Sequence, residues 1–140
     1  MQITEVNDKK IKVSVGLLIE RNKILISSRK ENKIYNRLWE FPGGKVKKNE
    51  STINALRREL NEELSINIDL NHTELCSNYS YKYKESCVDL YFFTCMKWTG
   101  KVFPLEGQKI EWLKKNEIKN SRLLPSNKII LKKIRNDLLI

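Results

Sequence analysis

The sequence contains one histidine, three cysteines and no apolar run that approaches the length of a membrane span. A helix needs roughly 20 consecutive apolar residues to cross a bilayer. The N-terminal segment 1–16 also lacks the basic start, apolar centre and small-residue cleavage site of a signal peptide. These absences argue against a membrane-spanning protein and against an exported one, so we expect a cytoplasmic location.

The few cysteines and the single histidine also argue against several kinds of site. Cys76, Cys87 and Cys95 form no close metal-type pair, and an odd number without an export signal predicts reduced thiols. Cys87 and Cys95 lie in a β-like stretch, where we expect them to pack in or near the core. A zinc site or a Ser-His-Asp triad needs more than His72, which lies in a polar, turn-like stretch. We expect His72 on the surface.

Acidic residues are fewer than basic ones, with 17 Asp and Glu against 27 Lys and Arg and a net charge of +10. This excess has two interpretations. It could attract nucleic acid or nucleotide phosphates. It could also be background composition, because the lysines are scattered along the chain and their clusters contain no interleaved aromatic residues. The scatter favours background, with some help in attracting polyanions.

The chain of 140 residues is long enough for one hydrophobic core and predicts a single domain over residues 1–140. Hydrophobic residues make up 40% and charged residues 31%, as in globular proteins. Apolar runs predict strands, and apolar residues at helical spacing predict helices. We expect a helix from Ser51, a terminal helix over 127–139, and strands over 10–21, 24–29, two stretches within 77–98, and 108–115. This order predicts a mixed sheet with helices packed on it.

Both predicted helices have one apolar face. In the first, Ser51 is a suitable N-cap, and an apolar stripe follows at helical spacing: Ile53, Leu56, Leu60 and Leu64. In the terminal helix we expect Ile130, Ile134 and Leu138 to face inward.

The first helix also carries an acidic face made of Glu59, Glu62 and Glu63. Residues three or four apart are neighbours on a helix, and like charges there cost a few tenths of a kcal/mol each. One interpretation is a solvated face with Arg57 and Arg58 as ion-pair partners. The other is a divalent-metal site, because Mg²⁺ prefers oxygen ligands and is usually held by a few carboxylates with substrate phosphates.

The context upstream of the helix favours the metal site. Gly44 is followed after five residues by Glu50, and after seven more by Arg58-Glu59-Leu60, one residue, Glu62-Glu63, one residue and Ser65-Ile66. This pattern resembles the Nudix box, Gx5Ex7REUxEExGU with U apolar. It departs once, because Ser65 stands where the box has glycine. That position ends the helix, where glycine eases a left-handed turn, and the change removes no carboxylate.

The resemblance implies an α/β Nudix fold, an αβα sandwich with a mixed β-sheet. It implies hydrolysis of a nucleoside diphosphate linked to another moiety, with Mg²⁺, or alternatively Mn²⁺, as cofactor. The Glu50–Arg58 pair matches an ion pair that buttresses the metal site, and such partners orient metal ligands. The metal ligands implied are Gly43 through its carbonyl, Glu59, Glu62, Glu63 and Glu106.

The resemblance extends from about residue 12 to residue 134. Within the family, the chain is similar to the MutT branch through three stretches, "LWEFPGGK", "EGQKIEW" and "LLPSNKII". That branch converts 8-oxo-dGTP to 8-oxo-dGMP and pyrophosphate, which avoids mutation during DNA replication and repair. It implies a catalytic set of Arg58, Glu59, Glu62, Glu63 and Glu106, with Glu59 or Glu106 as general base. It implies substrate contacts at Arg29, Glu40, Phe41, Pro42, Gly43 and Asn127.

Asn127 is the residue that the resemblance assigns to reading the base. An amide side chain offers a donor and an acceptor, and 8-oxoguanine presents an N–H at position 7 beside O6. Guanine presents two acceptors there, so it would leave the amide oxygen facing a lone pair. Adenine also presents a donor and an acceptor. A helix cap is the alternative role for an asparagine at this position.

Other functions also fit parts of the sequence. A related branch resembles CTP or pyrimidine nucleotide pyrophosphohydrolases, which typically have an acidic residue where Asn127 stands. Removal of pyrophosphate from RNA 5′ ends would suit the basic charge. Non-catalytic Nudix-like modules that bind damaged DNA commonly lack the intact glutamate set, which is present here. We expect a monomer that binds a nucleotide substrate, with no stable nucleic-acid complex and no membrane partner.

Overall fold

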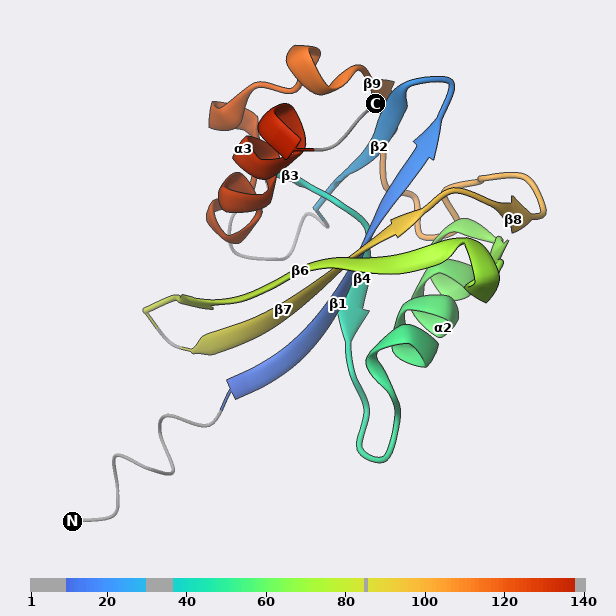
Figure 1. Ribbon diagram of the computed structural model, residues 1–140, viewed down its shortest axis with the longest axis horizontal. Helices are drawn as coiled ribbons and strands as arrows, with labels where there is room; N and C mark the ends of the chain where they lie inside the picture. Colours follow the sequence, from blue (N-terminus) through green and yellow to red (C-terminus); the bar gives the residue numbers. More distant parts are fainter. Residues whose placement is uncertain (1–9, 30–36, 85, 138–140) are drawn as a thin grey trace.

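The computed structural model describes residues 10–29, 37–84 and 86–137. Strands occupy the centre of the molecule and two helices lie on opposite sides of them (Figure 1). The strands are β1 (Lys10–Glu20), β2 (Lys23–Ser28), β3 (Trp39–Glu40), β4 (Gly43–Lys45), β5 (Asn67–Ile68), β6 (Thr73–Lys82), β7 (Cys87–Cys95), β8 (Trp98–Thr99) and β9 (Ile110–Leu113). The α-helices are α2 (Thr52–Leu64) and α3 (Lys128–Asp137), and the 3-10 helices are η1 (Leu70–His72), η2 (Lys115–Glu117), η3 (Asn120–Arg122) and η4 (Pro125–Asn127).

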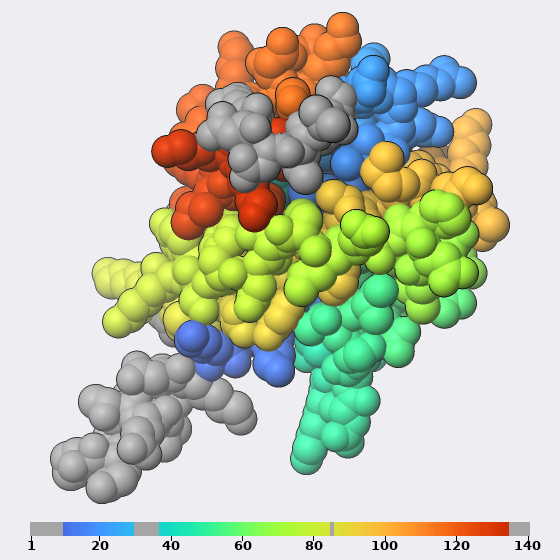
Figure 2. All heavy atoms as spheres, in the orientation of Figure 1, coloured from blue at the N-terminus to red at the C-terminus, as the bar shows by residue number. Residues whose placement is uncertain are grey.

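The main sheet is mixed, as predicted. Its strand order is β3-β2-β1-β7-β6, with β4 also paired to β1 and β9 to β2. Strands β1 and β7 run parallel, whereas the other neighbours pair antiparallel. A separate two-stranded sheet joins β5 and β8. In Figure 2, β6 crosses the visible face between α3 and α2, and the loop between β4 and α2 projects from the body.

The two strands expected over 10–21 and 24–29 form a hairpin as β1 and β2, but they soon separate. They pair only through Ile19 and Glu20, next to the turn at Arg21 and Asn22, both with positive φ. Further along, β1 pairs with β4 instead, and β3 pairs with the far end of β2. The segment 39–45 therefore bridges the fork between β1 and β2, where it brings Gly43 and Gly44 beside the centre of the sheet.

Alternation along β1 supplies both faces of the sheet. Val15, Leu17 and Ile19 belong to one core cluster, which includes the α3 residues Ile130, Leu131 and Ile134. Leu18 belongs to the other cluster, which includes the α2 residues Leu56, Leu60 and Leu64. Because side chains alternate across a strand, one strand contacts a helix on each side. The αβα sandwich is confirmed.

Helix α2 begins and ends as its sequence predicts. The Ser51 hydroxyl accepts a hydrogen bond from the Asn54 N–H, and Ser65 ends the helix in the left-handed conformation with φ 62°. Leu56, Leu60 and Leu64 are fully buried, and each such burial stabilises the fold by about 1.5–3 kcal/mol. This packing fixes the rotation of the helix and directs its glutamates away from the core.

The remaining predictions need small corrections. Helix α3 buries Ile130 and Ile134 as expected, whereas Leu138 lies outside the described residues. Strand β6 begins at Thr73, earlier than predicted, because its first residues pair with the end of β7. Strand β9 is shorter than the predicted 108–115, because only four of its residues pair with β2.

The cysteines and the histidine behave as expected. Cys76, Cys87 and Cys95 are free thiols, and burial raises the pKa of Cys95 to about 12. His72 lies at the surface, with Nδ1 3.1 Å from an Asp69 carboxylate oxygen. Among the helices of the described residues, none is long and apolar enough to span a membrane.

Candidate active site

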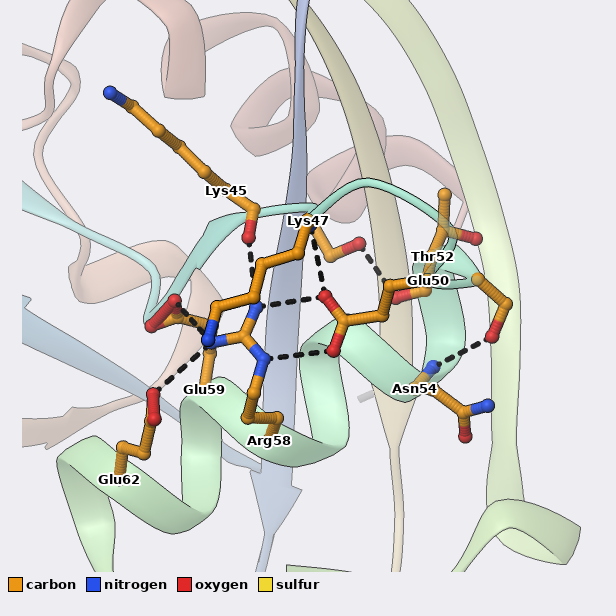
Figure 3. Close-up of polar contacts among 10 residues, drawn as sticks. Lys45, Lys47, Glu50, Thr52, Asn54, Arg58, Glu59 and Glu62 are labelled. Carbon is orange, nitrogen blue, oxygen red and sulfur yellow. Dashed lines mark hydrogen bonds and ion pairs between the residues drawn. The ribbon is translucent and has the colours of Figure 1, made fainter.

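Arg58 connects the glutamates of the acidic helix α2 to the loop that precedes the helix. Its guanidinium donates to both carboxylate oxygens of Glu50 at 2.8 and 2.9 Å, and to the Lys45 carbonyl at 3.0 Å. It also donates to Glu59 and to Glu62, both at 3.1 Å. Figure 3 shows Arg58 between Glu50 on one side and Glu59 and Glu62 on the other. Because an arginine has five N–H donors, these contacts fix its position and that of the loop before the helix.

The ion pair expected between Glu50 and Arg58 is confirmed. The two hydrogen bonds from Arg58 lower the pKa of Glu50 to about 2, with a further contribution from the Lys47 N–H. The pairing also raises the pKa of Arg58. Both groups are therefore charged over the whole pH range in which the folded protein would work. The ion pair beside Glu59 is thus present throughout that range.

The two glycines allow Glu59 and the sheet to approach closely. A Cβ atom at position 44 would overlap the carboxyl group of Glu59, and one at Gly43 would overlap the Ser14 carbonyl oxygen. The Ser14 hydroxyl also donates to the carbonyl of Thr52 at 2.7 Å, which ties β1 to the start of α2. Only glycine fits at position 43, where the clash is with backbone, whereas a side chain at position 44 would displace the carboxyl of Glu59. The carboxyl of Glu59 therefore lies directly against the backbone of the glycine turn.

Glu63 is the centre of a cluster of carboxyl groups. Burial is the largest cause that raises its pKa to about 9, followed by Glu59 through its charge and a hydrogen bond, and then by the charges of Glu40 and Glu106. Glu59 and Glu63 come from α2, Glu40 from β3 and Glu106 from the loop between β8 and β9. Carboxyl groups from three separate segments therefore lie within electrostatic reach of Glu63.

Glu62 lies differently from the other glutamates of the helix. Its side chain is 51% exposed and accepts a hydrogen bond from Arg58. It is also not among the largest causes that raise the pKa of Glu63. The structure thus connects Glu62 to the cluster through Arg58, and its role as a metal ligand stays a prediction.

The loop that carries Glu106 is docked on the C-terminal end of α2. The last carbonyls of a helix lack partners within it. Here the Glu63 carbonyl accepts hydrogen bonds from the Leu105 N–H at 3.0 Å and from the Gln108 side chain at 3.1 Å. The Leu64 carbonyl accepts from the Phe103 N–H at 2.9 Å. These contacts hold Glu106 within electrostatic reach of Glu63.

A cavity of about 390 Å³ lies next to this cluster. Its size falls in the range of small-molecule sites. Of the residues predicted to contact substrate, it is lined by Arg29, Glu40, Phe41, Gly43 and Asn127, and Gly44 also contributes. Arg29 donates to Glu40 at 2.7 Å at this wall. Pro42 is not among the lining residues; it is buried, and its carbonyl accepts from the Gly16 N–H in the sheet.

Asn127 is buried in the wall of the cavity, with 3% of its surface exposed. Its amide oxygen accepts a hydrogen bond from the Phe41 N–H at 2.9 Å. Its amide nitrogen lies 3.4 Å from the Ser126 hydroxyl. The side chain bonds across to the segment beside β3 and not to the N–H groups of α3, so the helix-cap alternative is wrong.

The carboxyl cluster suits a hard divalent cation, because all its ligand atoms are oxygens and Glu63 is half-buried with like charges around it. Within residues 10–29, 37–84 and 86–137, no three His, Cys, Asp or Glu side chains are grouped as a ready-made metal site. Mg²⁺ does not require such a group. It keeps several waters and is usually bound through one or two carboxylates together with substrate phosphates.

Several residues of the site were missed from the sequence. Gln108 stands in the "EGQ" stretch that supplied Glu106, and its capping of Glu63 depends on a contact across the fold. Tyr79 and Tyr83 on and after β6 reach the turn at Ser126. The aromatic alternation of 79–83 predicts that these residues share one face of a strand, but it does not tell which turn they would meet.

The fold and the site together define the class of protein: an α/β sandwich in which an acidic helix and a glycine turn serve a ligand cavity, as suits an enzyme that acts on phosphate anhydrides. The chain belongs to the NUDIX domain family, whose sequence pattern matches residues 10–134.

Relatives of known activity cover most of the chain. It is 37% identical over 107 residues to an 8-oxo-dGTP diphosphatase of Buchnera aphidicola. The aligned part covers 76% of this chain and 79% of the relative. It is 32% identical over 132 residues to an 8-oxo-dGTP diphosphatase of Haemophilus influenzae, with 93% and 96% covered. A CTP pyrophosphohydrolase of Escherichia coli is 32% identical over 114 residues, with 81% and 83% covered.

Solved structures of the family share the fold. One is described as MutT from Aliivibrio salmonicida and Vibrio cholerae, and it matches with a TM-score of 0.78 and 25% identity. The match covers 93% of this chain and 100% of that structure. The Nudix fold expected from the sequence is thereby confirmed.

Proposed function

We propose that this protein hydrolyses 8-oxo-dGTP to 8-oxo-dGMP and pyrophosphate in a reaction that depends on Mg²⁺, and so removes a mutagenic nucleotide before DNA replication and repair can use it. One observation carries the proposal. The buried amide of Asn127 lies in the wall of a cavity that also contains the glycine turn packed against Glu59. The relatives named as 8-oxo-dGTP diphosphatases support the same substrate.

The metal would be held by the carboxyl groups of Glu59, Glu63 and Glu106, with Glu62 and the carbonyl of Gly43 as further ligands. Mg²⁺, or Mn²⁺ in its place, would supply neutralisation of the polyphosphate charge and a more acidic bound water. The cation would neutralise the negative charge of the carboxyl cluster and would also bind the polyphosphate. An acidic cluster is therefore compatible with a basic protein whose ligands are a metal ion and a polyphosphate.

The side chains of this protein supply positioning, which is what phosphoryl transfer mainly needs. Arg58 holds Glu59 and Glu62 and is itself fixed by Glu50. Glu59 or Glu106 would accept the proton of the attacking water as general base. Arg29, paired with Glu40 at the cavity wall, would contact the nucleotide.

The base would be read at Asn127 and the backbone of Phe41. The amide oxygen already accepts from the Phe41 N–H, and a carbonyl-type oxygen has a second lone pair. That lone pair would accept the N–H at position 7 of 8-oxoguanine, and the amide nitrogen would donate to O6. Guanine would place an acceptor against the amide oxygen, and a buried mismatch of this kind discriminates strongly.

The test is kcat/KM for pyrophosphate release with Mg²⁺, compared for 8-oxo-dGTP, dGTP and CTP on one preparation. We expect 8-oxo-dGTP to be preferred over dGTP by a factor of about 100 or more, which corresponds to roughly 2.7 kcal/mol. Equal rates for 8-oxo-dGTP and dGTP would overturn the proposal while leaving hydrolysis of nucleotides intact.

CTP is the second candidate substrate, because one relative is named a CTP pyrophosphohydrolase. The amide of Asn127 argues against it, since the pyrimidine branch typically has an acidic residue there. A preference for CTP in the same assay would establish this alternative. The cytoplasmic location, the monomeric state and the single domain over residues 1–140 stay predictions.

A further inference from the structure

A chain of hydrogen bonds reaches Asn127 from the end of strand β6. The Tyr83 hydroxyl accepts from the Ser126 N–H at 3.0 Å and donates to the Ser126 hydroxyl at 2.7 Å. The Ser126 hydroxyl in turn accepts from the amide nitrogen of Asn127 at 3.4 Å, the longest of these contacts. Tyr83 and Ser126 both line the cavity.

A second tyrosine holds the turn that carries these groups. The Tyr79 hydroxyl donates to the Ser126 carbonyl at 2.6 Å and accepts from the Ile130 N–H at 3.2 Å. It thereby joins η4 to the first turn of α3. Ser126 is 2% exposed, so the three polar groups of this residue all bond inside the protein.

These contacts fix both ends of the Asn127 amide. The Phe41 N–H can only donate, so it requires the amide oxygen on its side. The Ser126 hydroxyl, whose position Tyr83 sets, accepts from the amide nitrogen on the other side. With one partner at each end, the plane of the amide is defined before any ligand enters.

We propose that Tyr83 and Ser126 are positioning residues that set the discrimination between 8-oxoguanine and guanine by holding the Asn127 amide in one orientation. The inference rests on the proposed function. An amide free to rotate can turn its NH₂ group toward the two acceptors of guanine, O6 and N7. An amide held at both ends must present its oxygen to position 7, which favours the N–H of 8-oxoguanine.

The experiment compares kcat/KM for 8-oxo-dGTP and dGTP in the wild type, Tyr83→Phe, Ser126→Ala and the double variant. We expect the ratio to fall about fivefold to tenfold in each single variant, as for the loss of one hydrogen bond. The double variant should fall no further, because the two residues act through one contact. The kcat for 8-oxo-dGTP should stay within about twofold of wild type, since the carboxyl cluster is untouched.

Tyr81→Phe is the matched control, because it removes a hydroxyl two residues before Tyr83, at the end of β6. Tyr81 packs against the ring of Tyr83 with centroids 4.8 Å apart. In the part of the chain that the structure describes, its hydroxyl makes no hydrogen bond, so its substrate ratio should equal that of the wild type.

Each other outcome has a definite meaning. A wild-type preference that persists in Tyr83→Phe and Ser126→Ala overturns the positioning role and leaves the proposed function standing. Equal losses for both substrates, with an unchanged ratio, show a structural role only and also overturn it. No preference in the wild type overturns the proposed function and this inference together. Should Ser126→Ala fail to fold, Tyr83→Phe decides, because it removes one oxygen from a partly exposed side chain.

Discussion

Glu63 holds its proton to a pH well above that of an ordinary carboxyl group, because burial and the neighbouring carboxylates of Glu59, Glu40 and Glu106 raise its pKa to about 9. The unfolded chain releases the same proton near pH 4.5. Between these two values the folded state binds more protons than the unfolded state. The free energy of unfolding contributed by this residue is therefore greatest at low pH and is lost as the pH rises toward 9.

We therefore predict that the metal-free protein becomes less stable from pH 6 to pH 8, by about 2–3 kcal/mol from Glu63 alone. Urea unfolding in the presence of EDTA at several pH values measures this change. Glu63→Gln should flatten the dependence and stabilise the metal-free protein at pH 8. The same variant should lose activity with Mg²⁺ by orders of magnitude.

Glu106→Gln is the matched comparison for this prediction, because it removes a charge near Glu63 without removing the buried carboxyl. It should retain a weakened pH dependence. Two results would contradict the account: a wild-type stability that rises between pH 6 and pH 8 in EDTA, or a Glu63→Gln variant as active as the wild type.

At the scale of the element, helix α2 has a serine at each end, and the two serines have opposite effects. Ser51 satisfies the Asn54 N–H at the start. Ser65 at the end adopts φ 62°, a left-handed conformation that costs a residue with a side chain about 1–2 kcal/mol. The Ser65 N–H still bonds to the Asn61 carbonyl, so the end of the helix is closed despite the strained residue.

We predict that Ser65→Gly stabilises the protein by about 0.5–1 kcal/mol, because glycine adopts this conformation without the steric cost. Ser51→Ala should destabilise it by about 1 kcal/mol through loss of the cap. Thermal unfolding of the two variants beside the wild type measures both, and kcat of Ser65→Gly should be unchanged. A destabilised Ser65→Gly would show that the serine side chain has a stabilising contact of its own.

These two ends also show which features a sequence can predict. The sequence predicts helix α2 from the cap at Ser51 and the apolar stripe that ends at Leu64, because these signals are local. The strands β3 and β4 were not predicted, because they are two or three residues long and exist only through pairing with β2 and β1. The positions of the site residues in the sequence came from the box pattern. The contacts of Gln108 and Tyr83 cannot be predicted from the sequence, since each contact depends on where another segment of the chain lies.

At the scale of the whole molecule, the net charge of +10 contrasts with the acidic cluster. Five lysines, Lys10, Lys12, Lys45, Lys47 and Lys48, line a second hollow of about 380 Å³. This hollow shares Ile11 and Lys45 with the cavity beside Asn127. A positive rim next to a cavity raises the local concentration of polyanions, so the charge need not be background alone.

We predict that raising salt from about 0.05 M to about 0.5 M lowers kcat/KM for the nucleotide about threefold to tenfold, because salt screens steering over distances beyond about 10 Å. The kcat at saturation should not change. Lys12→Gln should reduce the salt dependence. Lys97→Gln, beyond the opposite end of the β1–β7 ladder, should not. A kcat/KM independent of salt would leave the charge as background composition.

The parallel pairing of β1 with β7 has a consequence for how the protein is made. Lys10 pairs with Cys87 and Leu18 with Cys95, so the central strand receives this neighbour only after most of the chain has left the ribosome. Until then the side chains of β1 that are buried in the folded protein, within Val15 to Ile19, can pack only against β2 and α2, because the sheet is incomplete. Distant pairings of this kind slow folding and prolong the exposure of apolar surface during synthesis. The nascent chain is thus most vulnerable to aggregation before β7 is made, and a chaperone would have most to protect at that stage.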